Sequence, residues 1–456
     1  MPTISHTISD FAVNLKYQDL PPEVVFQVKR FLLDSIGCAF GGWDTEDVQI
    51  QHKLHQEMGG NGEATVMVSG AKMPMNHAAL LNSLLIRALD YNDIYWEEDP
   101  SHPSDIIPAA ITPAEALDKT GKDVITAIVL AYEFEQRMCE FSHPGIRERK
   151  WHHATLTGFV SPIVAGKILG LTVPQMVNAI GISGSHSCTL GAVTAGKLTN
   201  MKNSVDPMAT QAGVIASQLA QRGYSGPEHV IDGKEGLVDT FGPEFELTLL
   251  TDKLGKDWRI LRCSMKAFSA EALTHSPITA VLKIVKENNL KPGEIAEIKV
   301  KTVARAADIL SDPSKYKPTS KETADHSLPY CLAAAVVDGM VTPSQFKDEK
   351  LKDPQIWELL PKIKVVAEPE FEKLFPQLKA TEVAIATTEG KKHQLRVDYP
   401  KGDYRDPMSE NELIDKFDSM VLDKVGSAQR DRIVENIMDL EKVKSMKEFM
   451  RLMVQK

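Results

Sequence analysis

Hydrophobic residues recur every three or four positions through much of the chain. Within residues 75–90 this spacing gives an apolar stripe made of Leu80, Leu81, Leu84, Leu85 and Ala88. Such a stripe lies on one face of an α-helix. Comparable patterns are found at residues 105–117, 122–141, 156–169 and 174–182, and again from residue 409 to the end. The pattern therefore predicts a mostly helical protein.

Proline and glycine suggest where some of these helices begin and end. Pro21, Pro22 and Glu23 open a long apolar pattern, because proline fits the first helical turn and an acid suits its positive end. Gly37 is expected to end or interrupt that helix. A loop rich in Gly, Ser and Thr at 184–199 precedes Lys202, and the next helix is expected at about residues 207–222.

The pattern changes near residue 262. Residues 295–303 are expected to form a strand, and the apolar segments 383–388 and 393–397 flank Glu389-Gly390, as in a β-hairpin. We therefore predict the mostly α fold class, with a large all-helical domain at 1–262 and a smaller α+β domain at 263–403. Residues 404–456 are expected to be C-terminal helices that return to the helical domain.

Composition excludes several classes of protein. The 456 residues are 43% hydrophobic and 25% charged, as in ordinary globular proteins with two domains. No apolar run approaches the ~20 residues of a membrane span, and the N-terminus lacks a secretion-signal pattern. The five cysteines lie far apart without C-x-x-C spacing, which disfavours disulfides and iron–sulfur clusters and fits a cytoplasmic protein. The net charge of −10 argues against a nucleic-acid partner.

The segment 87–110 carries the clearest candidate chemistry. Asp90 and Asp93 follow the apolar stripe, and Pro100 and Pro103 stiffen the backbone around His102. A rigidly held histidine near a carboxylate can transfer protons near neutral pH. A solvated acidic loop with a surface histidine is the alternative interpretation of this segment alone.

Several short motifs together resemble the 2-methylcitrate dehydratase family, also called MmgE/PrpD. They are Ala88-Leu89-Asp90-Tyr91-Asn92-Asp93 with His102-Pro103-Ser104, Lys197-Leu198 with Lys202, Asp325-His326-Ser327-Leu328-Pro329-Tyr330, and Tyr399-Pro400-Lys401-Gly402-Asp403. They span most of the chain in the family's order. The resemblance implies that the α+β domain is a lid, that the protein is a homodimer, and that the active site lies between the domains without metal or organic cofactor.

The resemblance also implies roles for individual residues. Asp90 and His102 match the family's catalytic segment and are our candidates for proton transfer. In the decarboxylases of the family, the corresponding histidine matches His152 of this chain. In the dehydratases of the family, it matches His153. Catalytic candidates are therefore Asp90, His102, His152, His153 and Tyr330.

Three further residues are predicted to bind a carboxylate substrate, namely Lys202, Lys266 and His275. Simpler interpretations remain open for several candidates, because Lys202 could be an exposed lysine, His275 a helix cap and Tyr330 a core residue.

The resemblance predicts a lyase. We expect it to dehydrate 2-methylcitrate, or a close tricarboxylate, to 2-methyl-cis-aconitate by acid–base catalysis. Ser104-Asp105 and Asn92-Asp93 look more like the dehydratase branch, while His152 and His275 favour the alternative, a cis-aconitate decarboxylase that forms itaconate. An iminodisuccinate epimerase and an inactive scaffold are weaker alternatives, the latter because Ile94 replaces a common threonine.

Overall fold

A computed structural model describes residues 2–195, 198–242 and 244–455. The chain forms two compact units, which are described separately. Unit 1 comprises Met1–Cys263 and Glu410–Lys456, and unit 2 comprises Ser264–Ser409. The predicted mostly α fold class is confirmed, because helices dominate both units and the sheets are small.

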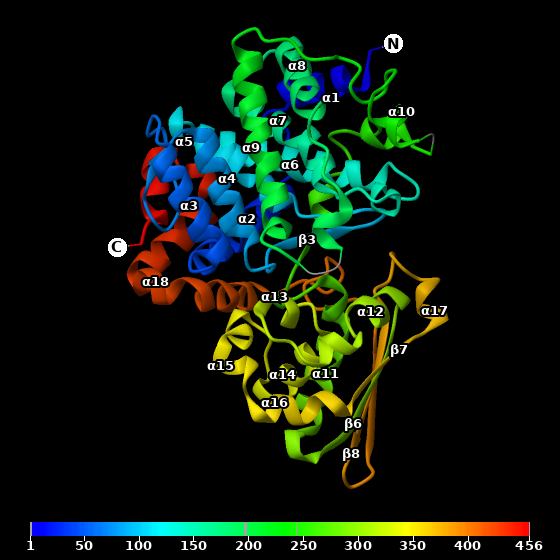
Figure 1. The fold of residues 1–456 in the computed structure, drawn as a ribbon. Helices are drawn as coiled ribbons and strands as arrows, with labels where there is room; N and C mark the ends of the chain where they lie inside the picture. Colours follow the sequence, from blue (N-terminus) through cyan, green and yellow to red (C-terminus); the bar gives the residue numbers. More distant parts are fainter. Residues whose placement is uncertain (1, 196–197, 243, 456) are drawn as a thin grey trace. The chain divides into compact units, whose positions relative to one another are not determined.

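Unit 1 is built almost entirely from helices (Figure 1). They are α1 (Ile4–Asn14), α2 (Pro22–Gly42), α3 (Glu46–Met58), α4 (Met75–Arg87), α5 (Ile107–Ala116), α6 (Gly121–Glu140), α7 (Ala154–Leu169), α8 (Val173–Gly184), α9 (Met201–Gln221), α10 (Leu237–Phe241), α18 (Glu410–Met438) and α19 (Met446–Met450). Two small hairpins join them: β1 (Ala64–Thr65) pairs with β2 (Lys72–Met73), and β3 (Asp93–Trp96) pairs with β4 (Pro100–Ser101).

Helix α7 forms the centre of unit 1 (Figure 1). It packs against α5, α6, α8 and α9, and all its residues except Lys167 are buried. A helix with apolar and small residues all round suits such a position. Gly213 lets α9 approach closely, because a Cβ there would lie 2.1 Å from Ser161 Oγ of α7. The contact fixes the spacing of two helices that carry site residues.

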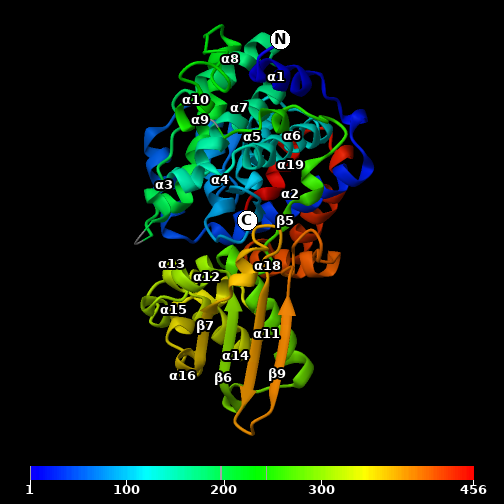
Figure 2. The same ribbon diagram turned by 90° about the vertical axis from the view of Figure 1, so that its right-hand side faces the viewer.

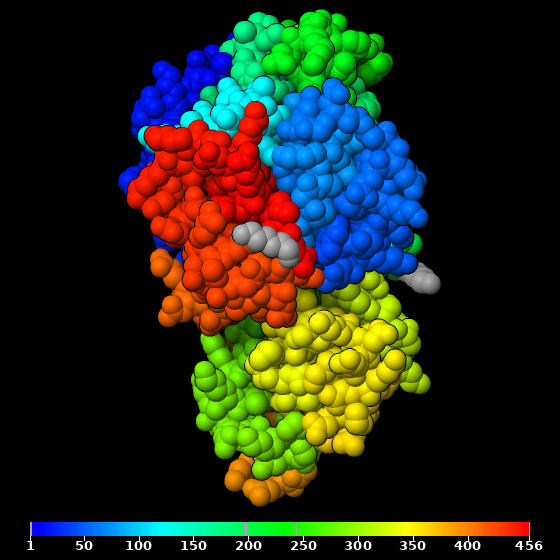
Figure 3. Space-filling view, turned by 90° about the vertical axis from the view of Figure 1, so that its left-hand side faces the viewer, coloured from blue at the N-terminus to red at the C-terminus, as the bar shows by residue number. Residues whose placement is uncertain are grey.

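The C-terminal helices pack against the N-terminal part of unit 1. Figure 3 shows the red C-terminal segment beside the cyan and blue elements, where α18 contacts α2 and α19 contacts α5. Gly37 does not end α2, which continues to Gly42. The expectation was wrong because Gly37 serves packing: a Cβ at this position would lie 3.0 Å from Phe417 of α18.

Helix α9 begins at Met201, six residues before the predicted start at Pro207. Proline inside a helix removes one backbone hydrogen bond, so the sequence favoured a helix start there. Side chains of the first turn are instead held by acids of other elements, because Lys202 Nζ lies 3.0 Å from Asp90 Oδ2 and Asn203 Nδ2 donates to Asp47 Oδ2 at 2.9 Å. Lys202 therefore lies on a helix rather than in a loop.

Unit 2 combines a four-stranded sheet with short helices. The strand order is β7-β6-β8-β9, where β6 is Ile295–Thr302, β7 is Ile363–Ala367, β8 is Thr381–Thr387 and β9 is Lys392–Val397. The helices are α11 (His275–Asn288), α12 (Ala304–Ile309), α13 (Lys321–Ala324), α14 (Leu328–Asp338), α15 (Asp348–Leu351), α16 (Pro354–Leu359) and α17 (Pro369–Glu372). A short strand, β5 (Ser264–Met265), begins the unit.

The sheet of unit 2 has one face against helices (Figure 2). Helix α11 contacts β8 and β9, and Val383 and Ile385 of β8 are fully buried at alternate positions. The predicted hairpin is confirmed, because β8 and β9 pair antiparallel and Gly390 adopts a positive φ of 84° at the turn. Strand β7, which pairs parallel to β6, was not predicted.

Candidate active site

Asp90 lies in a turn directly after α4. The helix ends at Arg87, and Asp90 adopts a left-handed backbone with φ of 51°, a conformation that aspartate tolerates better than most residues. Its Oδ1 accepts a hydrogen bond from Arg87 Nη1, and its Oδ2 lies 3.0 Å from Lys202 Nζ. The backbone turn thus places one buried carboxylate between two cations from α4 and α9.

Arg87, which the sequence analysis did not select, joins Asp90 to a second acid. Its Nε lies 3.6 Å from Oδ2 of Asp105. Burial alone would lower the pKa of Arg87, but Asp90, Asp105 and Asp206 together raise it above its ordinary value. The guanidinium is therefore a permanent positive charge in the interior of unit 1.

His102 is held by the hairpin that follows Asp90. Its Nδ1 lies 2.6 Å from the carbonyl oxygen of Asp93. A carbonyl oxygen can only accept, so Nδ1 carries the hydrogen and the lone pair of the neutral ring is on Nε2. This assignment makes Nε2 the atom through which His102 could act as a base.

Hydrogen bonds within the same segment fix the shape of this loop. The Asp93 carboxylate accepts hydrogen bonds from the backbone N–H of Ser104 at 3.0 Å and from its hydroxyl at 2.6 Å. Burial raises the pKa of Asp93 to about 6, although the bonds from Ser104 oppose the change. Asp93, Asp99 and His102 are all buried. The alternative of a solvated acidic loop with a surface histidine is therefore wrong.

His152 and His153 lie immediately before α7, and their rings are 3.9 Å apart. His153 Nε2 is 3.4 Å from Asp206 Oδ2, and the rings of His153 and His102 are 5.7 Å apart. His152 Nδ1 accepts a hydrogen bond from the backbone N–H of Ala154 at 3.2 Å. Burial, aided by His153, lowers the pKa of His152 well below its usual value, which favours a neutral ring.

Asp206, on α9, is the acid partner of this histidine pair. Burial alone would raise the pKa of Asp206, but His153, His152 and Arg87 lower it well below its usual range. Asp206 lies four residues after Lys202, so both side chains project from neighbouring turns of one helix. Asp206 was not predicted as a site residue, because its turn was expected to precede the helix.

Among the described residues, His152, His153 and Asp206 form a group whose donor atoms could surround one metal ion, since they lie within 4.8 Å of one another. A metal ion lies in the plane of each imidazole that binds it. The two rings are only 34° from parallel at 3.9 Å, so they would have to rotate before both could face one ion. The geometry fits a histidine–carboxylate pair better than a metal centre.

Three predicted residues belong to unit 2. Lys266 and His275 are buried, and His275 Nε2 is 3.1 Å from the carbonyl oxygen of Ala270. Tyr330 is fully buried in α14, and its hydroxyl donates to the carbonyl oxygen of Gln345 at 2.7 Å. Burial raises the pKa of the Tyr330 hydroxyl above its usual value. These contacts accord with the core role left open for Tyr330, and the substrate roles of all three residues remain predictions.

Lys197, part of one family motif, lies outside the described residues. Within unit 1 the structure brings together Asp90, His102, His152, His153 and Lys202, and it adds Arg87 and Asp206.

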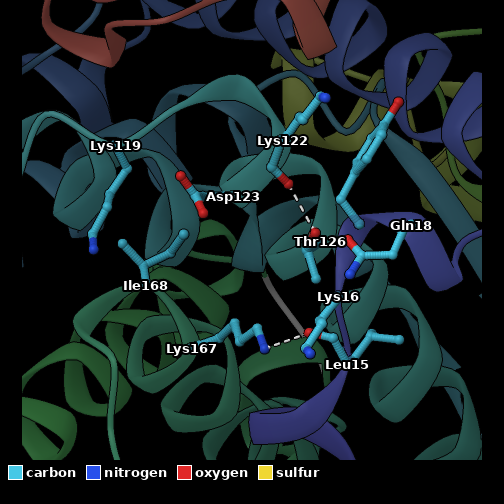
Figure 4. A pocket seen from close by; sticks show the side chains of 10 residues that line it. Leu15, Lys16, Gln18, Lys119, Lys122, Asp123, Thr126, Lys167 and Ile168 are labelled. Atoms are coloured by element: carbon cyan, nitrogen blue, oxygen red, sulfur yellow. Dashed lines mark hydrogen bonds between the residues drawn. The ribbon is translucent and has the colours of Figure 1, made fainter.

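A separate pocket of about 300 Å³ lies elsewhere in unit 1, between α6, α7 and the segment after α1. Figure 4 shows that Lys119 and Lys122 at its edge extend away from each other, on either side of Asp123. The Lys167 ammonium donates to the carbonyl oxygens of Val13 and Leu15. These lysines do not converge on one point. None of the residues Asp90, His102, His152, His153, Lys202, Arg87 and Asp206 lines the pocket.

Comparisons with known proteins cover most of the chain. The model of the MmgE/PrpD N-terminal domain matches residues 6–250, and that of the MmgE/PrpD C-terminal domain matches residues 268–440. Cis-aconitate decarboxylases from Aspergillus terreus and Homo sapiens are each 26% identical to it, over 96% of this chain and 92% of their own. The 2-methylcitrate dehydratase of Escherichia coli is 23% identical, over 98% of this chain and 96% of its own.

Among the described residues, no helix has both the length and the apolar character that crossing a membrane requires.

Proposed function

Because the chain belongs to the MmgE/PrpD family, we propose that it is a lyase that removes water from 2-methylcitrate or a closely related hydroxy-tricarboxylate. One observation carries this proposal. Two histidines, His102 and His153, lie within one buried cluster beside the cations Arg87 and Lys202. The cluster therefore combines two groups that can transfer protons with two that can bind carboxylates.

Dehydration requires both a base and an acid. The base removes a proton from the carbon next to a carboxylate, and the acid protonates the departing hydroxyl group. His102 suits the base, because its Nδ1–H faces the carbonyl of Asp93 and its Nε2 carries the lone pair. His153 suits the acid, because its Nε2 lies 3.4 Å from the Asp206 carboxylate, which leaves Nδ1 as the atom that can deliver a proton.

The cations serve a different purpose. Proton removal places extra negative charge on the neighbouring carboxylate of the substrate, and preorganised positive groups stabilise that charge. Lys202 lies 3.0 Å from Asp90, which holds the ammonium in place beside Arg87. Asp90 has cations at both of its oxygens, so this geometry supports a role in positioning Lys202 as well as the predicted role in proton transfer.

Cis-aconitate decarboxylation is the second candidate. It is favoured by the higher identity to the cis-aconitate decarboxylases, 26% against 23% for the dehydratase. That reaction also needs cations to hold carboxylates, but it needs only one acid to protonate carbon. The pair His102 and His153 supplies one group more than decarboxylation requires, which is why we place dehydration first.

A substrate panel separates the two candidates. Purified protein is incubated with citrate, 2-methylcitrate, isocitrate and cis-aconitate, and the products are identified by mass spectrometry while released carbon dioxide is measured. We expect loss of water from 2-methylcitrate or a close analogue, without carbon dioxide. The control is Lys202→Met, which keeps most of the length of the side chain and removes its charge. Release of carbon dioxide from cis-aconitate, with no dehydration of any hydroxy acid, would instead establish the decarboxylase.

A further inference from the structure

A line of four buried side chains leads away from the cluster behind His153. Glu135 of α6 lies 2.8 Å from the Thr157 hydroxyl of α7, and that hydroxyl lies 3.2 Å from Oδ1 of Asp206 on α9. The other oxygen of Asp206 lies 3.4 Å from His153 Nε2. None of the four side chains is part of a surface, since the residues are at most 6% exposed.

The contacts of the Thr157 hydroxyl indicate that one of its two acid neighbours, Glu135 or Asp206, is protonated. The hydroxyl has a single hydrogen, yet both of its partners are carboxyl oxygens. An ionised carboxylate can only accept a hydrogen bond, so two ionised acids could not both be satisfied by one hydroxyl hydrogen. One of the two acids therefore carries a proton and donates it toward Thr157.

The surroundings identify Glu135 as the protonated acid. Asp206 faces His153, His152 and Arg87, which favour its ionised form. The charged groups that act on Glu135 include Asp206, Asp93 and Asp105, and all three are acids. Burial raises the pKa of Glu135 to about 8, with the neighbouring Thr157 hydroxyl opposing and the first two acids adding to the change. The hydrogen bonds thus run from Glu135 to Thr157 and from Thr157 to Oδ1 of Asp206, while Oδ2 of Asp206 faces His153 Nε2 at 3.4 Å.

We propose that Asp206 is a positioning residue for His153, held in place by Thr157 and by protonated Glu135. This inference rests on the proposed dehydratase function. The carboxylate fixes the His153 ring with its Nε2–H toward Asp206, so that Nδ1 is the atom that gives up a proton.

The positioning accounts for every proton in the reaction. The substrate C–H proton passes to His102, the C–O bond breaks with its electron pair, and the Nδ1 proton of His153 joins the departing hydroxide to form water. His153 keeps its Nε2–H on Asp206, and proton exchange with water then returns both rings to their starting states.

Steady-state kinetics of Asp206→Asn and Thr157→Val test the proposal. Asp206→Asn should lower kcat by ~10²–10⁴-fold, the range of general acid–base catalysis, with KM changed by less than about threefold. Thr157→Val should lower kcat by about 10- to 100-fold, the range of one hydrogen bond to a charged group, and Thr157→Ser should restore most of it.

A matched control is available one turn further along α7. Ser161 is also buried, and its hydroxyl donates to the carbonyl oxygen of Ala209 on α9 at 2.8 Å. Ser161→Ala removes a hydroxyl between the same two helices without touching the Glu135–Thr157–Asp206 line, and it should leave kcat unchanged. Equal losses in Ser161→Ala and Thr157→Val would overturn the proposal in favour of a packing role.

A second readout does not depend on turnover. In protein labelled with ¹⁵N-histidine, we expect a histidine Nε2–H resonance that is protected from exchange, lost in Asp206→Asn and His153→Ala, and kept in Ser161→Ala. If no substrate of the panel reacts but this resonance follows Asp206, the proposed function fails and the positioning of His153 stands. If substrate reacts while Thr157→Val and Asp206→Asn keep parental kcat, the positioning fails and the function stands. Activity that requires added Zn²⁺ would overturn the positioning in favour of a metal centre.

Discussion

Glu135→Gln offers a quantitative test of the proton assigned to Glu135, because it removes the ionisable group and keeps the shape of the side chain. Burial raises the pKa of Glu135 to about 8 in the folded protein, from the ordinary glutamate value of 4.5 that applies to the unfolded chain. Between these values the folded protein keeps a proton that the unfolded chain has lost. The free energy of unfolding contributed by this group is therefore complete below pH 4.5 and falls as the pH rises to 8.

The size of the effect follows from the width of that interval. Each pH unit between the two pKa values costs about 1.4 kcal/mol of stability. Between pH 5 and pH 8 the loss attributable to Glu135 is therefore about 4 kcal/mol. Glutamine does not titrate, so the stability of Glu135→Gln relative to the parent should rise by about this amount over the same range.

Urea unfolding of both proteins at pH 5, 6, 7 and 8 measures the difference. Pairing the proteins at each pH cancels the titration of all groups that do not interact with Glu135. Ser161→Ala neither adds nor removes an ionisable group, so its stability difference from the parent should be the same at every pH. A difference for Glu135→Gln that is also independent of pH would mean that Glu135 is ionised in the folded protein, and the hydrogen-bond directions assigned to Thr157 would be wrong.

Three further predictions concern substrate binding, packing and cofactors. Lys202→Ala should lower kcat and also raise KM by about 10- to 100-fold in steady-state kinetics, because a carboxylate is held in both ground and transition states, and an unchanged KM would remove it from binding. Gly213→Ala places a Cβ 2.1 Å from Ser161 Oγ and should lower the free energy of unfolding by about 1–3 kcal/mol, whereas a parental urea midpoint would show that α7 and α9 can separate without cost. Activity should survive chelators and air, as the family resemblance implies, and its loss on metal removal with recovery on metal addition would contradict a cofactor-free mechanism.

The sequence predicted helices best where an apolar stripe is long and uninterrupted. The stripe at residues 75–90 correctly predicted the existence and start of α4, which ends at Arg87, three residues early, and alternation around Glu389-Gly390 predicted the hairpin of unit 2. Proline and glycine misled where tertiary packing outweighed local preference, as at Gly37 in α2 and Pro207 in α9. Strand β7 was not predicted, because it has only five residues and is stabilised by pairing with β6, which lies far away in the sequence.

The candidate site was predicted in part, because family motifs selected residues that touch each other but not those that support them. Arg87 and Asp206 carry no motif, and only the fold brings them to Asp90 and His153. A signal for buried acids was present in α6. Glu133 and Glu135 lie about 200° apart around a helix, so both could not lie on the same solvent-exposed face.

The most direct measurement of the central claim is the kcat of His102→Ala on the substrate that the panel identifies. His102 is the base in this account, so the variant should lose ~10²–10⁴-fold in kcat with a much smaller change in KM. His229→Ala, which removes an exposed histidine of the same unit, serves as the control and should keep parental kinetics. Circular dichroism establishes that both variants are folded. A folded His102→Ala protein within about threefold of the parental kcat would contradict the account, and His152 or His153 would then be the next candidate base.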